Sequence, residues 1–525
     1  MPASTVSLSR AVKRGQNQSD SIRITLTLLA GVSARLRNPM NMRMFLPVLI
    51  LSTLVAIAGS VVAVEPCRIE VTERDSDWPV PMVELRTVSG IRLVSDNAGV
   101  IVCDAPELMG QEMWFYVHGQ GYGVKPDEFG YEGIMLIPQP GETLRVEVDR
   151  RILARRIGRI TGSGLYAESA KCGDKPLVED SGIIGCDSVQ TAIHRGRLHW
   201  VWGDSNLARY PLGIFHASSA TSTTQPLASA EPPLVLSLDY FRDEQGFPRG
   251  VAPIDGEGPT WLFALVSLDD AAGTSHLVAS YVKIAPPLSV WQLGLCEWNE
   301  ATKQFERTCV LWDKADGGEQ PELPHGHAAK WTDELGNEWV LLGNPFPTVK
   351  IPATYEGWKE WKRWERFEAP TLLQSTDGSR VKPHSGSIAW NGFRGRWVAI
   401  FMEAFGKPSG FGEIWYAEAE SPFGPWGTAV KVLSHQNYSF YNPQIHPEFT
   451  SHDSPHLFFE GTYTTLFAGP TTGGGLSPTY PQATPRYDYN QMLYRLDLDD
   501  PALIAAQDSR SSGGKLGTGV RAARE

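Results

Sequence analysis

Four windows of 20 residues align with one another without a gap, and this internal repeat restricts the possible folds more than any other feature of the chain. The windows span residues 186–205, 326–345, 385–404 and 442–461. Each window reads as a strand, a polar turn and a second strand. Gly196, Gly336 and Gly395 share one column at the turn, where a tight hairpin favours positive φ. The windows therefore predict a series of antiparallel hairpins.

Further strands extend these hairpins into larger units. A divergent fifth copy with a longer turn spans residues 258–284, and GIFHASSA (213–220) matches EIWYAEAE (413–420) as a third strand. The second of these strands runs into SPFGPW (421–426), whose prolines cannot donate to a strand ladder and so end the pairing. Five units at intervals of roughly 60–70 residues predict a five-bladed β-propeller from about 155 to 500.

The strand followed by SPFGPW resembles a blade strand of the five-bladed propeller glycosidases, the arabinanase, xylosidase and fructosidase superfamily. The resemblance covers about two thirds of the chain. It implies a propeller fold and a glycosidase site, with a catalytic base at the start of the first inner strand.

A separate module precedes the propeller at residues 66–150. Alternating runs at 82–86 and 91–94 read as strands, and the DNAG segment at 96–99 reads as a turn. The Pro-Val-Pro segment at 79–81 and this turn resemble a transthyretin-like, carboxypeptidase-regulatory-type β-sandwich, which implies a structural or adhesive spacer. The expected fold is thus all-β, an N-terminal β-sandwich followed by a five-bladed β-propeller.

The apolar run Phe45 to Val64 follows Arg43 and ends in small residues, which is the pattern of a secretory signal. We read residues 1–64 as a signal region with a misassigned start, because methionines stand at 40, 42 and 44. The expected location is secreted, periplasmic or cell-surface, without stable membrane insertion once the signal is cleaved. A single-pass anchor is the alternative. The tail 501–525 is expected to be disordered.

Six cysteines fit an exported protein and form three local pairs. A turn at 302–303 would place Cys296 opposite Cys309 in a hairpin, which predicts a disulfide. Cys67 with Cys103, and Cys172 with Cys186, are the other expected pairs.

The charge balance argues against a nucleic-acid partner. The chain has 47 Lys and Arg against 59 Asp and Glu, a net charge of −12, and no long basic run lies in its body. No CxxC occurs, so a zinc site is not expected, and no His and carboxylate spacing typical of metal ligands appears. No cofactor is therefore expected. A structural cation such as calcium in the propeller channel stays open. The expected partner is a carbohydrate substrate.

Acidic side chains recur at one end of the predicted hairpins. The start of the first strand and the end of the second lie at the same end, so Asp187 and Asp204 should lie on one face. The column of Asp204 also holds Asn344, Glu403 and Glu460. These side chains should meet at the rim of a central funnel.

Two carboxyl groups across a pocket are what glycoside hydrolysis requires, one to protonate the leaving oxygen and one to attack carbon or activate water. The resemblance assigns the base to Asp187. His327 and His384 occupy the places of the expected acid, so Glu403 or Glu460 must supply it. The candidate catalytic residues are Asp187, Glu403, Glu460 and Asp204. The alternative for each is a turn or strand-end residue with no part in catalysis. Glu257 is a weaker candidate.

Neutral polar and aromatic groups near the same end are candidates for binding substrate: His327, His384, Asn344, Trp202 and Asn442. Two insertions flank the site. Trp358, Trp361, Trp364 and Phe367 recur every third residue, which predicts one packed stripe of a short helix, with sugar stacking as the alternative. The loop 464–489 is long enough to act as a lid.

Three functions fit these features. The first is an exported glycoside hydrolase acting on a poly- or oligosaccharide. The second is a non-catalytic propeller that binds a glycan or a protein at the cell surface. The third is a polysaccharide lyase, in which His or Tyr would abstract the proton.

Overall fold

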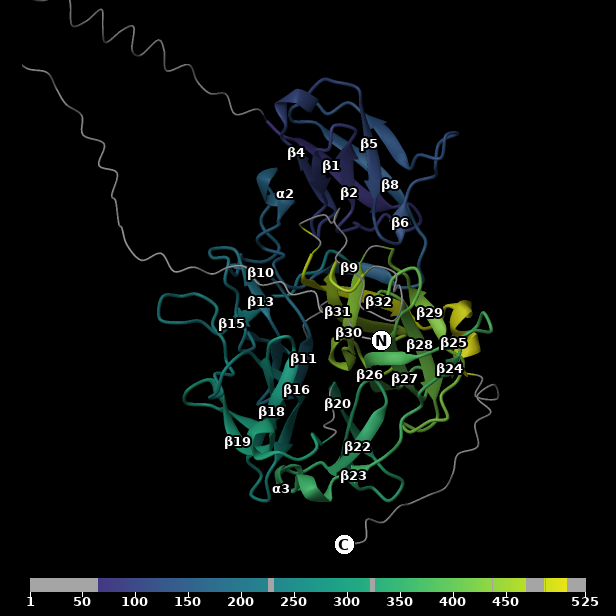
Figure 1. Ribbon diagram of the computed structural model, residues 1–525. Helices are drawn as coiled ribbons and strands as arrows, with labels where there is room; N and C mark the ends of the chain where they lie inside the picture. Colours follow the sequence, from purple (N-terminus) through teal and green to yellow (C-terminus); the bar gives the residue numbers. More distant parts are fainter. Residues whose placement is uncertain are drawn as a thin grey trace, which may run out of the picture. The chain divides into compact units, whose positions relative to one another are not determined.

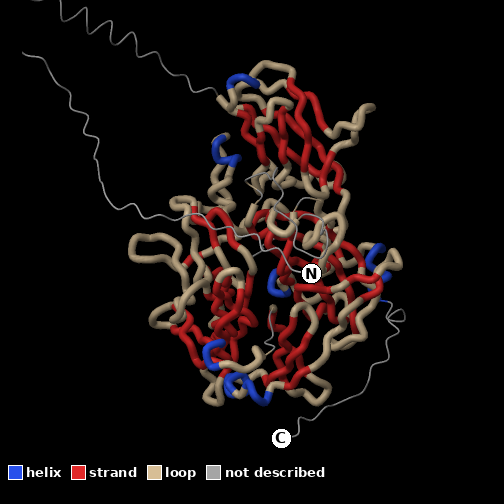
Figure 2. Tube along the Cα trace, viewed as in Figure 1, coloured by secondary structure: helices blue, strands red, loops and turns tan. Residues whose placement is uncertain are grey.

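The computed structural model describes residues 65–224, 231–321, 326–436, 438–468, 486 and 488–507. Strands dominate this part of the chain, which confirms the all-β expectation (Figure 2). The expected signal segment, most of the expected lid loop and residues 508–525 of the expected tail lie outside the described residues. The first part of that tail was expected to be disordered but forms the 3-10 helix η5 (Pro501–Gln507), in which Leu503 and Ala506 are buried. Among the described residues, no helix has the length and apolar character needed to cross a membrane.

The N-terminal module is a sandwich of two four-stranded sheets (Figure 1). Buried side chains of both sheets, such as Ile69, Leu85 and Phe115, form one shared core. The first sheet has the order β4 (Val100–Cys103), β1 (Cys67–Glu73), β8 (Thr143–Arg150), β6 (Tyr122–Gly123). The second has the order β3 (Arg92–Val94), β2 (Glu84–Thr87), β5 (Met113–His118), β7 (Gly133–Leu136).

Five four-stranded antiparallel sheets follow the sandwich, and each is one blade. Blade I contains β11 (Val189–His194), β12 (Arg197–Trp202), β14 (Ser219–Ser222) and β15 (Asp239–Tyr240). Blade II contains β16 (Thr260–Asp269), β17 (Ser275–Ala285), β18 (Ser289–Asn299) and β19 (Gln304–Asp313). Blade III contains β20 (His327–Thr332), β21 (Glu338–Gly343), β22 (Pro347–Pro352) and β23 (Glu365–Arg366). Blade IV contains β26 (Pro383–Asn391), β27 (Arg396–Glu403), β28 (Ile414–Ala419) and β29 (Val430–Leu433). Blade V contains β30 (Ser439–Ile445), β31 (His456–Thr464), β32 (Asn490–Asp497) and β9 (Arg155–Arg159).

The first strand of each blade belongs to a closed ring. β11 contacts β16, β16 contacts β20, β20 contacts β26, β26 contacts β30, and β30 returns to β11. The outer strand of blade V is β9, which precedes blade I in the chain and pairs with β32. The sheets therefore form a five-bladed propeller whose last blade is completed by its N-terminal strand.

The sequence repeat corresponds to the inner hairpins of the blades. The shared glycines have φ of +74°, +83° and +60°, and a side chain there would meet open space, so the backbone conformation alone favours glycine. The third strand of blade IV ends at Ala419, just before SPFGPW, and Trp426 of that segment is buried against Phe346. In blade I the third strand begins only at Ser219, because Ile214 pairs instead with Ser205.

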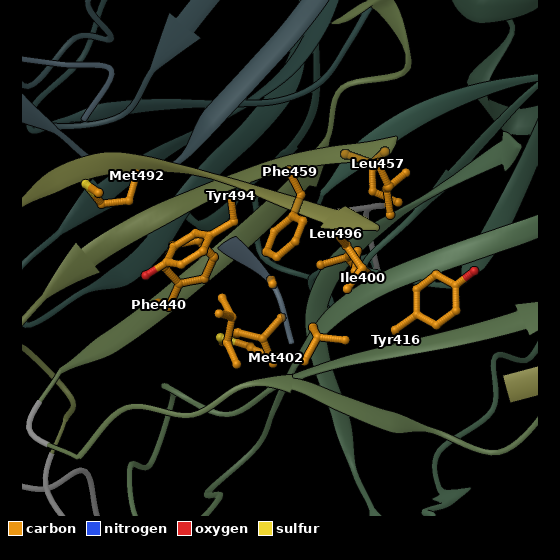
Figure 3. Close-up of a cluster of buried hydrophobic side chains, with 14 of the residues drawn as sticks. Ile400, Met402, Tyr416, Phe440, Leu457, Phe459, Met492, Tyr494 and Leu496 are labelled. Carbon is orange, nitrogen blue, oxygen red and sulfur yellow. The ribbon is translucent and has the colours of Figure 1, made fainter. Parts of the chain in front are cut away.

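Aromatic and aliphatic side chains fill the space between blades IV and V (Figure 3). Ile400 and Tyr416 come from blade IV, and Phe440, Phe459 and Tyr494 come from blade V. The Tyr494 ring stacks on Phe459 at 5.8 Å and meets the edge of Phe440 at 5.3 Å. Burying each such side chain contributes about 1.5–3 kcal/mol, so this layer holds blades IV and V together.

The expected Cys296–Cys309 disulfide is absent, and all six cysteines are free thiols. The hairpin closes over four residues, since Asn299 pairs with Gln304, and a bulge then places Cys309 opposite Leu295. Neighbouring positions on a strand face opposite sides of the sheet, so the two sulfurs lie in different packing layers. The other two expected pairs are likewise unbridged, although Cys67 and Cys103 lie directly opposite each other.

The predicted aromatic stripe is core at two of its four positions, whereas Trp361 is half-buried and Phe367 is exposed. Helix α3 (Tyr355–Lys359) is short, and the 3-10 turn η3 (Trp361–Arg363) follows it. Trp358 and Trp364 are buried in the layer that includes Val349, as core packing predicts.

Candidate active site

Asp187 and Asp204 lie side by side at the end of blade I where its inner strand begins. Asp187 follows the short strand β10 (Ile183–Cys186), which pairs with β13 (Ser205–Leu207). The Asp187 amide donates to the Asp204 carbonyl at 3.0 Å, and the Gly203 amide donates to the Asp187 carbonyl at 2.8 Å. A Cβ at Gly203 would overlap Asp187 Oδ1, so only glycine lets this carboxyl fold back over the turn.

The Asp187 carboxyl is partly buried and accepts several hydrogen bonds. Its Oδ1 accepts from the Asp204 amide at 2.7 Å, and its Oδ2 accepts from the Tyr441 hydroxyl at 2.9 Å. The Tyr489 hydroxyl is a further partner. Burial first, and then the neighbouring Asp204 charge, raise the pKa of Asp187 to about 7, although the phenol donors oppose this change. Asp187 therefore exchanges its proton near neutral pH.

The Asp204 carboxyl is held by the neighbouring blade. Its Oδ1 accepts from the indole nitrogen of Trp261, on the inner strand of blade II, at 3.1 Å. Burial raises the pKa of Asp204, and the indole donor opposes this. Two carboxyl groups with raised pKa values thus adjoin one another at this rim.

Glu403 is the last residue of β27 in blade IV and pairs with Pro383 at the start of that blade's inner strand. Its Oε2 accepts from the Trp415 indole nitrogen at 3.1 Å, and burial raises its pKa. Glu403 therefore resembles Asp204 in its surroundings, a partly buried carboxyl held by one indole donor.

Glu460 is buried within its strand and does not stand at the strand end. It stands inside β31, opposite Gln444, because a bulge between Tyr441 and Gln444 shifts the register of the hairpin. Its side chain is fully buried, and its Oε1 lies 3.2 Å from His446 Nε2. Glu448 flanks the same histidine at 3.0 Å, and these two acids raise the pKa of His446 to about 9 against the opposing effect of burial.

Asn442 and Asn344, two of the candidates for substrate binding, join neighbouring blades instead of standing free. The Asn442 backbone amide donates to Ser385 Oγ at 3.2 Å, and its side-chain Nδ2 donates to Ser188 Oγ at 2.6 Å. Asn344 Oδ1 accepts from the Gly386 amide at 2.9 Å. Together with the Trp261–Asp204 bond, these contacts run around the beginnings of the inner strands.

The remaining candidates have different surroundings. His384 is exposed and packs on the Phe411 ring at 5.1 Å. His327 is buried, and burial and nearby His446 lower its pKa to about 3, which keeps it neutral. Trp202 is buried and stacks between Trp200 and Tyr240, so it is a core residue.

Four aromatic residues that hold the carboxyls were not singled out from the sequence: Tyr441, Tyr489, Trp261 and Trp415. Tyr441 immediately precedes the fourth repeat window, and Trp261 lies at the start of the divergent copy. Tyr441, Tyr489 and Trp261 bind carboxyls of a neighbouring blade, which the repeat alone does not predict, whereas Trp415 binds Glu403 of its own blade. Among the described residues, no group of three or more His, Cys, Asp or Glu is arranged to hold a metal ion.

Comparisons with known proteins find likeness at the level of structure. No protein-family model matches the chain, and no curated protein matches its sequence. An exo-1,5-α-L-arabinanase from a bovine ruminal metagenomic library is 11% identical and covers 60% of this chain and 94% of its own, with a TM-score of 0.34. An exo-β-1,3-galactanase from Clostridium thermocellum is 10% identical and covers 59% and 58%, with a TM-score of 0.33. A GH43_1 enzyme from Xanthomonas citri is 10% identical and covers 55% and 85%, with a TM-score of 0.30.

The identities and TM-scores of these solved structures are too low to assign a family to this chain or a role to any of its residues. The five-bladed architecture rests on the sheet order and the closed ring of inner strands.

Proposed function

We propose that the chain is an exported glycoside hydrolase that cleaves glycosidic bonds of a poly- or oligosaccharide at the rim containing Asp187 and Asp204. One observation carries the proposal: a carboxyl whose pKa is raised to about 7 adjoins a second carboxyl where the inner strands begin. A group that is protonated below pH 7 suits proton transfer to a leaving oxygen.

In the proposed reaction, Asp187 is the acid and not the base that the sequence resemblance implies, because its raised pKa keeps it protonated below about pH 7. It supplies a proton to the glycosidic oxygen as the bond to carbon breaks. The second carboxylate faces the positive charge that develops on the sugar and either attacks carbon or takes a proton from water. Asp204 is the acid whose charge raises the pKa of Asp187, and Glu403 of blade IV is the alternative second carboxyl. Tyr441 and Tyr489 are positioning residues, because they hold Asp187 Oδ2 through hydrogen bonds.

A non-catalytic glycan-binding propeller is the second candidate, and one observation favours it. Both oxygens of Asp187 already accept hydrogen bonds from the protein, so this carboxyl is also suited to a structural role at the junction of blades I and V. Such a protein would bind glycan without turnover.

The test is a screen of the full-length protein against plant and algal polysaccharides, including arabinan, galactan and xylan, with analysis of the products. Asp187→Asn is the central variant, because an amide oxygen can still accept from the Asp204 amide and its nitrogen can donate to the Tyr441 oxygen. We expect turnover to fall by about 10³-fold or more with the fold retained. Asp204→Asn and Glu403→Gln identify the second carboxyl, since only the true partner causes a comparable loss.

Glu420→Gln is the matched control, because its side chain is 86% exposed on the same propeller. Turnover that survives in Asp187→Asn would exclude the proposed role of Asp187. Binding without turnover in the unaltered protein would favour the second candidate, and an unsaturated product absorbing in the ultraviolet would indicate a lyase. Export is tested separately by sequencing the N-terminus of protein recovered outside the cytoplasm.

A further inference from the structure

A row of aromatic side chains extends from the Asp187 site to the end of blade IV. The Tyr441 ring, whose hydroxyl donates to Asp187, lies 6.1 Å from Phe467. Phe467 lies 6.1 Å from Phe411, and Phe411 lies 5.6 Å from Phe405. The row therefore begins at one candidate carboxyl and ends two residues beyond another, Glu403.

Phe411 is the support of this row. It is buried, and three rings pack on it: His384 at 5.1 Å, Phe405 at 5.6 Å and Phe467 at 6.1 Å. In contrast, Phe405 is 44% exposed, and His384 is exposed. A buried ring that supports two exposed rings produces a fixed platform with open aromatic surface.

The backbone presents these rings at a conformational cost. Phe405 has φ of +60° and Phe467 has φ of +61°, in the left-handed region that bulky residues rarely adopt. Conformations of this kind cluster at binding and catalytic sites, where the surrounding structure enforces them. Two such residues pack on one buried phenylalanine, which indicates that their rings serve binding as well as core packing.

We propose that His384, Phe405 and Phe467 form a platform on which successive sugar units of the substrate stack, which makes the substrate a chain of several sugars rather than a mono- or disaccharide. The inference rests on the proposed function for the position of the scissile bond near Asp187. Aromatic faces attract the C–H faces of sugar rings and also exclude water from them. Because His384, Phe405 and Phe467 all pack around the buried Phe411, the platform offers ring faces for more than one sugar unit.

The test compares chain lengths in the full-length protein. Phe405→Asn removes the ring but tolerates the left-handed backbone, and His384→Ala removes the second exposed ring. Phe393→Asn is the matched control, because Phe393 is 42% exposed in the turn at the opposite end of the same β26–β27 hairpin. Circular dichroism and thermal melting establish that all three variants fold.

Binding is measured by affinity electrophoresis in arabinan, galactan and xylan, with Asp187→Asn as the common background. Loss of one stacked ring is expected to weaken binding to the polysaccharide about tenfold in Phe405→Asn and in His384→Ala, with no change in Phe393→Asn. In the Asp187-containing protein, kcat/KM should fall for long oligosaccharides and stay constant for a short aryl glycoside.

Unchanged binding and unchanged chain-length preference in both platform variants would overturn the inference. This outcome can be distinguished from failure of the proposed function, because the binding assay uses the Asp187→Asn background and does not require turnover. If the platform variants lose binding but the unaltered protein shows no turnover, the platform is supported and the hydrolase proposal is refuted.

Discussion

Asp187 should destabilise the folded chain at neutral and alkaline pH, and Asp187→Asn should remove this effect. Its pKa rises from the ordinary 3.8 to about 7 on folding. Because a tenfold change in proton affinity is worth about 1.4 kcal/mol, this difference corresponds to about 4 kcal/mol. The carboxyl is partly buried, so solvent screening reduces this value only moderately.

The sign follows from the number of bound protons. Between pH 3.8 and about 7 the folded chain holds a proton on Asp187 that the unfolded chain has released, so the free energy of unfolding falls as pH rises through this window. Below the window both states are protonated and the effect vanishes. Above it the penalty is complete, since the folded chain must carry a buried carboxylate.

The assay is chemical denaturation of the unaltered protein and Asp187→Asn at half-unit steps from pH 3.5 to 8.5. The variant should match the unaltered protein near pH 3.5 and exceed it by up to about 4 kcal/mol at pH 8. Glu420→Gln should show no such pH-dependent gain, because Glu420 is exposed. A stability difference that is constant across the range, or that favours the unaltered protein at pH 8, would refute the burial argument for Asp187.

Three other changes test separate contacts. Glu460→Gln should destabilise the chain by about 3–5 kcal/mol in thermal or chemical unfolding, since it removes one partner of a buried charged pair, and NMR titration should show the pKa of His446 falling from about 9. Gly203→Ala should lower kcat/KM at least about tenfold while melting near the unaltered protein, because the added methyl group displaces the Asp187 carboxyl; an unchanged rate would contradict that role. Asp270 and Glu297 raise the pKa of His276, so its contribution is complete below pH 6.5 and is lost as pH rises through the raised value. His276→Gln should therefore cost more melting temperature at pH 5.5 than at pH 8.5, and an equal cost at both would exclude the ion pairs.

The internal repeat allowed the five-bladed propeller to be predicted from the sequence. Hairpins with a glycine at each turn specify local pairing, and five of them restrict the chain to few closed arrangements. The pairing of β9 with blade V could not be predicted from the sequence, because Arg155–Arg159 lies far from β32 in the chain and belongs to no repeat window. Pairing of such distant segments depends on closure of the whole ring.

The alignment column that holds Asp204, Glu403 and Glu460 predicted the positions of these carboxyls less reliably, because the hairpins do not all pair their strands in the same register. An ungapped alignment assumes that every hairpin pairs its strands identically. Asp187 and Asp204 obey this assumption, but the bulge before Gln444 moves Glu460 into the strand interior. The hairpin of Cys296 and Cys309 fails similarly, through a four-residue turn and a bulge. A one-residue slip reverses the side of the sheet that a residue faces, so bulges limit what periodicity alone predicts.

The surroundings of the rim carboxyls share one physical arrangement. Asp187 is held by tyrosine hydroxyls, Asp204 by Trp261 and Glu403 by Trp415, and in each case burial raises the pKa while the aromatic donor opposes the rise. At Glu403 the charge of Lys431 also opposes the rise, but Lys431 is hydrogen-bonded to Glu413. A Lys or Arg partner would lower these pKa values and keep the groups ionised at every relevant pH. Neutral donors fix the orientation of each carboxyl and leave its proton exchangeable. An arrangement selected only to join the blades would not need this property, since full ionisation with a basic partner would stabilise the rim better.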